Sequence, residues 1–420
     1  MKQFFRLVMI LALVPSAFAQ VWVDTQKWNN DWEAKFATWM QSSAVQERLF
    51  VDARSPYAGI VADCADAAYA FRAIFAYENG LPFAIRNPSG ARAGQPAYAN
   101  FNNRIDRFNY VRDPNKRVVA FLNYIGSSVG SENLTRNDTF PVAISQLRSG
   151  DMFSYRITAR FNNFIRHVYN IKNINPTGSF DVIYSTQAIA DKNLPMIRRR
   201  EREFVHLPHD AWGFRRFRWP EYIGQPISAI PASLGNSNEQ YDLVRQYGDG
   251  FFRQIKRQLS TITETPDARM KRAMNNLCIE SQARIEFVDQ GLSFMASING
   301  RCMDYAQFDA YSTPARDGAL AQVFERTRDT YQEILRNRED GQVSRQWLQF
   351  AKAIFNGERG SESELTSFCP ITYKRGTTIN LAELRARIVA GKLSSHPNDT
   401  VEHRWGEPTR AARTRCRAFY

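Results

Sequence analysis

The chain has 420 residues, of which 55 are basic and 42 acidic, so its formal net charge is +13. With 44% hydrophobic and 13% aromatic residues, its composition is that of a globular protein with a large core and excludes a disordered or low-complexity chain. The excess of positive charge favours association with anionic polymers or membrane surfaces and carries no information about the fold.

Residues 1–19 have the three parts of a secretory signal. Lys2 and Arg6 are the positive residues, an apolar stretch follows at 7–14, and Ala17-Phe18-Ala19 is a small-x-small cleavage site. We therefore expect cleavage before Gln20 and a secreted or periplasmic bacterial protein. No later apolar run is long enough for a membrane helix, so no transmembrane span is predicted.

The five cysteines lie at positions 64, 278, 302, 369 and 416. An oxidising compartment tends to pair cysteines, and an odd number leaves at least one unpaired. The simplest pairing joins 278 with 302 and 369 with 416, although four cysteines allow three pairings. This pairing leaves Cys64 as a free thiol in the first half of the chain.

Two helices are predicted near the N-terminus. Apolar residues at helical spacing indicate one amphipathic helix over 25–50 and another over about 64–78, ended by Asn79-Gly80. Residues 87–117 are rich in Asn, Arg, Gly and Pro and are interpreted as an irregular surface excursion. The segment 116–130 has the pattern of a helix running into a loop.

From about residue 141 the pattern changes to that of strands. Segments 150–159, 166–174 and 179–187 are rich in β-branched and aromatic residues, and "NINPTGSF" predicts a hairpin between the last two. Residues 195–222 show no clear period. A cluster of Pro, Ser, Gly and Asn around 225–240 indicates a domain boundary. Helices are expected beyond it, over 240–262, 265–298, 316–338 and 343–357.

Cys64 follows Asp63 at the expected start of the second helix. A helix N-terminus carries unpaired N–H groups and partial positive charge, which favour a thiolate. A nucleophilic thiol also needs a base, and His167, at the start of a predicted strand, is the best candidate among five histidines. His206 and His209 form an H-x-x-H-D cluster without further metal ligands nearby. The alternative role for Cys64 is that of a small buried hydrophobic residue.

These motifs resemble the NlpC/P60 cysteine peptidases over residues 56–187. The resemblance rests on Pro56-Tyr57, Asp63-Cys64 and Gly80-Leu81-Pro82, and on the segments "LRSGDMF", "RHVYNI" and "FDVIYST". It implies a papain-like fold, with a helix packed on an antiparallel sheet, and cleavage of amide bonds in bacterial cell-wall peptides. It also implies Cys64 as nucleophile and His167 as base, without a cofactor or metal.

The third catalytic residue is left open by the sequence. Tyr184 falls at the usual position of that family, and Asp181, Ser185 or Gln187 can serve with a small change of register. A transglutaminase-like cysteine enzyme is the close competitor, since it also places a histidine and an aspartate on consecutive strands. His167 and Asp181 have a spacing that a hairpin accommodates.

Two basic runs, 196–203 and 214–220, interleave arginine with aromatic residues. Such runs can bind nucleic acid through phosphate contacts and stacking. In a secreted protein the expected partners are instead peptidoglycan or another anionic cell-envelope polymer, or the protein's own carboxylates. A solvated pair of arginine-rich strands is the alternative.

The patterns together predict an α+β protein with a signal peptide over 1–19, a papain-like hydrolase domain over 20–228 and a mainly helical, disulfide-containing domain over 240–420. The predicted function is a secreted cysteine hydrolase that cleaves peptidoglycan stem peptides through Cys64 and His167. The alternatives are a transglutaminase-like enzyme and a non-catalytic secreted protein that binds the cell wall.

Overall fold

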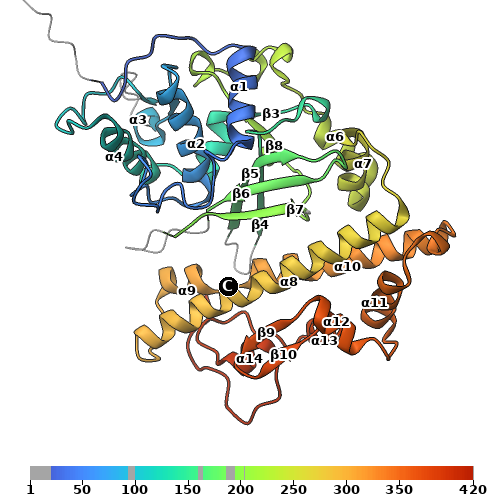
Figure 1. The fold of residues 1–420 in the computed structure, drawn as a ribbon. Helices are drawn as coiled ribbons and strands as arrows, with labels where there is room; N and C mark the ends of the chain where they lie inside the picture. The colour runs from blue at the N-terminus through green and yellow to red at the C-terminus, as the bar shows by residue number, and fades with distance from the viewer. Residues whose placement is uncertain (1–19, 93–99, 159–163, 186–193, 203, 420) are drawn as a thin grey trace, which may run out of the picture.

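The computed structural model describes residues 20–92, 100–158, 164–185, 194–202 and 204–419. The predicted signal peptide and Gln187 lie outside these ranges. Within them, no helix is both long and apolar enough to cross a membrane. The described part combines helices with antiparallel sheets (Figure 1), which confirms the expected mixture of the two.

The N-terminal part of the chain is helical around two short strands. Its elements are α1 (Asn30–Gln41), α2 (Cys64–Glu78), β1 (Ala84–Arg86), α3 (Pro88–Arg92), β2 (Asn100–Asn102), α4 (Pro114–Gly126) and α5 (Ser131–Asn133). The prediction for α2 is confirmed. The single helix expected over 25–50 is wrong in length, because Asn29 caps its start and the chain leaves the helix at Ser42. Lys172 Nζ donates hydrogen bonds to the carbonyls of Met40, Ser42 and Val45. These bonds hold the segment that follows α1 in turns.

The main sheet has six antiparallel strands in the order β3-β8-β4-β5-β6-β7. The strands are β3 (Thr139–Pro141), β4 (Met152–Thr158), β5 (Phe164–Ile174), β6 (Phe180–Tyr184), β7 (Ile197–Arg202) and β8 (Gly213–Phe217). The three strands predicted from periodicity are β4, β5 and β6, and the expected hairpin joins the last two. For β7 and β8 the sequence shows no clear period, because both are rich in arginine, which masks the alternation of a strand. Strands are expected there only as the alternative for the two basic runs.

The C-terminal part is mainly helical, as predicted. Its helices are α6 (Glu239–Tyr247), α7 (Phe251–Leu259), α8 (Pro266–Ser297), α9 (Tyr305–Tyr311), α10 (Pro314–Arg336), α11 (Arg345–Asn356), α12 (Glu362–Phe368), α13 (Leu381–Val389) and α14 (Val401–Trp405). A two-stranded sheet, β9 (Ile371–Lys374) with β10 (Thr377–Ile379), lies among them.

Each face of the main sheet is covered by different helices, because successive side chains of a strand point to opposite faces. On one face, Val168 and Ile183 join the buried cluster of α1, α2 and α4. On the other face, Tyr169 and Tyr184 join a cluster that includes residues of α7 and α8. Figure 1 shows α2 on one side of the sheet and α8 on the other.

Helices α6 and α7 follow the domain boundary expected at 225–240, yet both pack against the main sheet. The side chain of Gln240, in α6, hydrogen-bonds both the N–H and the C=O of Phe214, in β8. Phe251 and Phe252, in α7, are buried in the same cluster as the strands. The hydrophobic core of the sheet therefore continues into the helical half of the chain.

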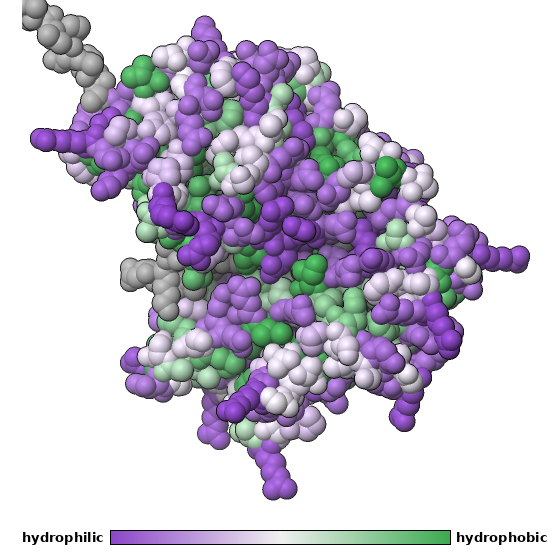
Figure 2. Space-filling view, viewed as in Figure 1, coloured by the Kyte–Doolittle hydropathy of each residue, from purple (hydrophilic) through white to green (hydrophobic). Residues whose placement is uncertain are grey.

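Arg202 of β7 and the two arginines of β8 are buried and have partners inside the protein. Arg216 forms an ion pair with Asp151, Arg202 forms one with Glu280, and Arg215 donates to the backbone of β3 and the turn before it. A purely solvated pair of arginine-rich strands is therefore wrong for these runs, since charges removed from water need partners. Figure 2 shows hydrophilic residues across the visible face over β7, where the less buried arginines of that strand lie.

Two disulfides are present, and their connectivity differs from the simplest pairing. Cys278 is joined to Cys369 and Cys302 to Cys416, so the pairing of neighbours in the sequence is wrong. The reason is the length of α8, since Cys278 lies in its middle and packs beside the C-terminal core, whereas Cys302 follows its far end. Cys64 is free, as predicted, and it is buried, as the alternative role of a small hydrophobic residue expects.

Candidate functional site

Cys64 is the first residue of α2, and its neighbours cap that helix. Asp63 accepts hydrogen bonds from the N–H groups of Ala65 (2.8 Å) and Asp66 (2.9 Å), while the Asp66 side chain accepts one from the Asp63 N–H (3.0 Å). This reciprocal arrangement is a capping box. It fixes the point at which the helix begins and thereby the position of the thiol.

The Cys64 thiol lies in a buried environment that disfavours its ionised form. Burial, and after it the negative charge of Asp63, raise the pKa of the thiol to about 12. Contacts with the Ser131 hydroxyl, 3.5 Å from Sγ, and with the Val168 backbone favour the thiolate but do not outweigh the burial. The helix N-terminus alone therefore leaves the thiol protonated at neutral pH.

His167 lies on β5, opposite Tyr155 of β4. Its ring packs among three tyrosines, with ring-centroid distances of 5.9 Å to Tyr155, 4.5 Å to Tyr169 and 5.0 Å to Tyr184. Because Val168 points toward α2, its neighbour His167 points toward the face covered by α8. Among the described residues, no hydrogen bond joins the imidazole to the Cys64 thiol.

The electrostatics of this environment keep the imidazole neutral. Burial, together with the positive charges of Arg316, Arg202 and His206, lowers the pKa of His167 to about 3. A neutral imidazole retains a lone pair that can accept a proton, but a low pKa makes it a weak base.

The structure separates the candidates for the third catalytic residue. Tyr184 contacts the His167 ring directly, and Ser185, which follows it, is buried. Asp181 lies at the opposite end of the hairpin, where it pairs with Asn173 across the sheet. Six residues of β5 separate that position from His167, which corresponds to about 20 Å along an extended strand. Its carboxylate accepts hydrogen bonds from Asn175 Nδ2 and the Glu201 N–H, both 3.0 Å away.

Cys64 and His167 line one cavity, which has a volume of about 390 Å³. Its walls come from both halves of the chain, since residues of α2, α5 and the sheet lie opposite residues of α8, α9 and α10. Ser131 and Tyr155 lie on the sheet side of this cavity. Phe287 and Arg316 lie on the helical side.

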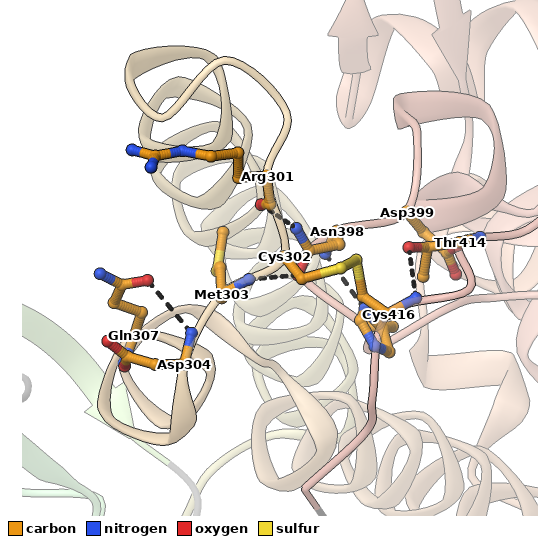
Figure 3. The surroundings of a disulfide bond; sticks show 10 residues. Arg301, Cys302, Met303, Asp304, Gln307, Asn398, Asp399, Thr414 and Cys416 are labelled. Atoms are coloured by element: carbon orange, nitrogen blue, oxygen red, sulfur yellow. Dashed lines mark hydrogen bonds between the residues drawn. A yellow bond between two sulfur atoms is a disulfide. The ribbon is translucent and has the colours of Figure 1, made fainter.

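The end of the chain also reaches this cavity. Phe419 lines it and packs against Phe308 of α9 at a ring-centroid distance of 5.3 Å. The disulfide between Cys302 and Cys416 holds the last residues beside α9 (Figure 3). Asn398 supports this junction by donating to the Arg301 carbonyl, and the Thr414 N–H donates to Asp399.

The other histidines have local roles within the described chain. His206 packs on Tyr155 at a centroid distance of 4.2 Å, and His209 Nε2 contacts the Arg156 carbonyl at 2.8 Å. The acidic member of the H-x-x-H-D cluster, Asp210, pairs with Arg136. Among the described residues, no three of His, Cys, Asp and Glu group together in a way that could hold a metal ion.

Ser131 and Arg316 are among the residues of this cavity that sequence reasoning missed. Both lie far along the chain from the motifs around Cys64 and His167, and neither has a distinctive local pattern. Only the packing of α10 against the sheet face could reveal that Arg316 lies beside the tyrosines.

Comparisons with protein-family models, with curated proteins and with solved structures find no match to this chain.

Proposed function

We propose that this protein is a secreted cysteine hydrolase with a papain-like arrangement, which cleaves amide bonds in peptidoglycan stem peptides. Cys64 would be the nucleophile and His167 the base. The observation that carries the proposal is a free thiol at the start of α2 that opens on the same cavity as a neutral imidazole. The net positive charge of the chain fits an anionic cell-wall polymer.

In this proposal the described arrangement is the resting state of the site. Moving a proton from a thiol with a pKa of about 12 to an imidazole with a pKa of about 3 spans nine units. At about 1.4 kcal/mol per unit, this transfer costs roughly 12 kcal/mol. A productive complex therefore requires that the substrate bring the imidazole within reach of the thiol and offset the charges that weaken it.

The proposed reaction has two steps. The Cys64 sulfur attacks the amide carbonyl while its proton passes to His167, and the imidazolium then protonates the leaving amine. Water next attacks the thioester with His167 as base, which releases the carboxylic acid and restores the thiol.

The test is digestion of purified peptidoglycan sacculi, with released amino groups as the readout. Cys64→Ser and His167→Gln are expected to lose release by at least a hundredfold. His209→Gln is the matched control, because this exposed histidine bonds only a backbone carbonyl in the described structure, and it is expected to retain the wild-type rate. Release by Cys64→Ser at the wild-type rate would contradict the proposal.

A second candidate function is favoured by the burial of the thiol. With a raised pKa and no hydrogen bond to His167 within the described chain, Cys64 also fits a non-catalytic protein that holds cell-wall polymer. That function predicts that the protein sediments with sacculi while releasing no amino groups. Cys64→Ala would then bind as well as the wild type.

A further inference from the structure

Five arginines line the cavity that contains Cys64 and His167, and four of them have carboxylate partners. Arg166 pairs with Glu132, Arg199 with Glu286, Arg202 with Glu280 and Arg284 with Asp317. The fifth, Arg316, has neither a hydrogen-bond acceptor nor a carboxylate at ion-pair distance among the described residues. Arg316 is therefore the arginine of this wall that has no direct partner in the described chain, although the charge of the adjacent Asp317 acts on it at longer range.

The surroundings of Arg316 hold its guanidinium in place and facing the cavity. It lies in the first turn of α10, and its guanidinium carbon is 3.9 Å from the centroid of the Phe287 ring in α8. It lies within electrostatic range of Tyr155, Tyr169 and Tyr184, the three rings around His167. Stacking on an aromatic face orients the planar group and leaves its edge N–H donors available.

A partly buried cation without a partner is costly, so its retention points to a ligand. Asp309, an exposed acid that also lines the cavity, is not within ion-pair distance of it. Asp317, the next residue, is already held by Arg284, Thr313 and Ser395. The fork of a guanidinium matches the two oxygens of a carboxylate, with which it forms paired hydrogen bonds.

We propose that Arg316 binds a carboxylate of the ligand that occupies this cavity, and that the substrate is a peptide bearing a free carboxylate near the cleaved bond. The choice of a stem peptide rests on the proposed function, whereas the choice of a carboxylate rests on the cavity itself.

Binding at Arg316 would also affect the base. The charge of Arg316 is the largest electrostatic cause, after burial, that lowers the pKa of His167. A carboxylate bound there neutralises this charge and raises the pKa of His167, which strengthens the imidazole as a proton acceptor. An anionic substrate would thus help to activate the site that cleaves it.

The test measures binding by calorimetry in the Cys64→Ala background, so that no cleavage interferes. The probes are a stem tetrapeptide with the free α-carboxylate of its D-glutamate and the same peptide with that group as an amide. A charge-assisted pair predicts that the acid binds roughly ten- to a hundredfold more tightly than the amide. Arg316→Gln should abolish this preference, and Arg316→Lys should retain part of it. Arg328→Gln, on the same helix and outside the cavity, should leave it unchanged.

Equal affinity of the Cys64→Ala protein for acid and amide would overturn the inference, and so would an undiminished preference in Arg316→Gln. These outcomes are distinct from failure of the proposed function. A preference that depends on Arg316, together with no cleavage by the wild type, would uphold the carboxylate site and reject the hydrolase. Cleavage of the acid and of the amide peptide at equal rates by the wild type would uphold the hydrolase and reject the carboxylate site.

Discussion

The charge of Asp63 is predicted to suppress the reactivity of the Cys64 thiol. Asp63 caps α2 immediately before the cysteine, and after burial its charge is the next largest cause that raises the pKa of the thiol to about 12. Asp63→Asn removes the charge and keeps a side-chain oxygen that can cap the helix, since Asn is as good an N-cap as Asp. The thiol of this variant should therefore ionise more readily while the helix keeps its start.

The expected size of the effect follows from the pKa of the wild-type thiol and from the charge that Asp63→Asn removes. In the wild type, a pKa of about 12 leaves only about one thiol in ten thousand ionised at pH 8. Two unit charges about 4 Å apart interact by roughly 4 kcal/mol at an effective dielectric constant of about 20, which sets an upper limit for the effect of the Asp63 charge. Contact with solvent reduces this value, so the variant should gain about one pKa unit of acidity and react about tenfold faster.

The assay is alkylation by iodoacetamide without a reducing agent, followed by intact mass. Only Cys64 can react, because the other four cysteines are in disulfides. The native wild type should react roughly a thousandfold more slowly than the protein unfolded in guanidinium. Asp113→Asn is the matched control, since it changes the N-cap of α4 instead. Half-maximal reactivity of the native wild type below pH 8, or no acceleration in Asp63→Asn, would refute this reasoning.

Three further predictions concern stability and connectivity. Lys172→Met should lower the free energy of unfolding by roughly 3 kcal/mol in urea titrations, because three carbonyls lose their donor, whereas exposed Lys116→Met should change it little. Burial raises the pKa of Asp138 to about 7, so the folded state keeps a proton that the unfolded state loses near pH 4. Stability should therefore fall by roughly 4 kcal/mol between pH 4 and pH 7 on account of this group, and Asp138→Asn should flatten that slope in unfolding titrations at pH 5 and pH 8. A wild-type slope that persists in the variant would contradict this account. Peptide mapping without reduction should recover the links Cys278–Cys369 and Cys302–Cys416, and a peptide linking Cys278 to Cys302 would show the connectivity to be wrong.

The elements that sequence reasoning predicted well are those whose local signals agree with their packing. The start of α2 was predictable because Asp63 is a strong N-cap, and its end because Asn79-Gly80 terminates a helix. The strand β5 was predictable from its β-branched and aromatic residues. Strand β7 was predictable only as an alternative, because its arginines, including Arg202, find partners on α8 that no local pattern reveals. Tertiary pairing thus overrides local propensity there.

The candidate site also has a part that the sequence predicted and a part that it did not. The sequence singled out Cys64 and His167, and both line one cavity. It could not foresee that the imidazole packs among tyrosines on the α8 side, because the face on which a strand residue lies depends on the register of the whole sheet. Nor could it foresee Arg316, which reaches the cavity through the docking of α10.

The two disulfides interleave along the chain, since Cys302 lies between Cys278 and Cys369, and Cys369 lies between Cys302 and Cys416. Along the chain, Cys64, Cys278 and Cys302 all precede Cys369 and Cys416, the native partners of Cys278 and Cys302. An oxidant that joins cysteines in their order along the chain would therefore form a non-native bond, beginning with Cys64 and Cys278. Formation of the native pairs therefore requires that oxidation wait for Cys369 and Cys416, or that a non-native bond be rearranged by thiol–disulfide exchange.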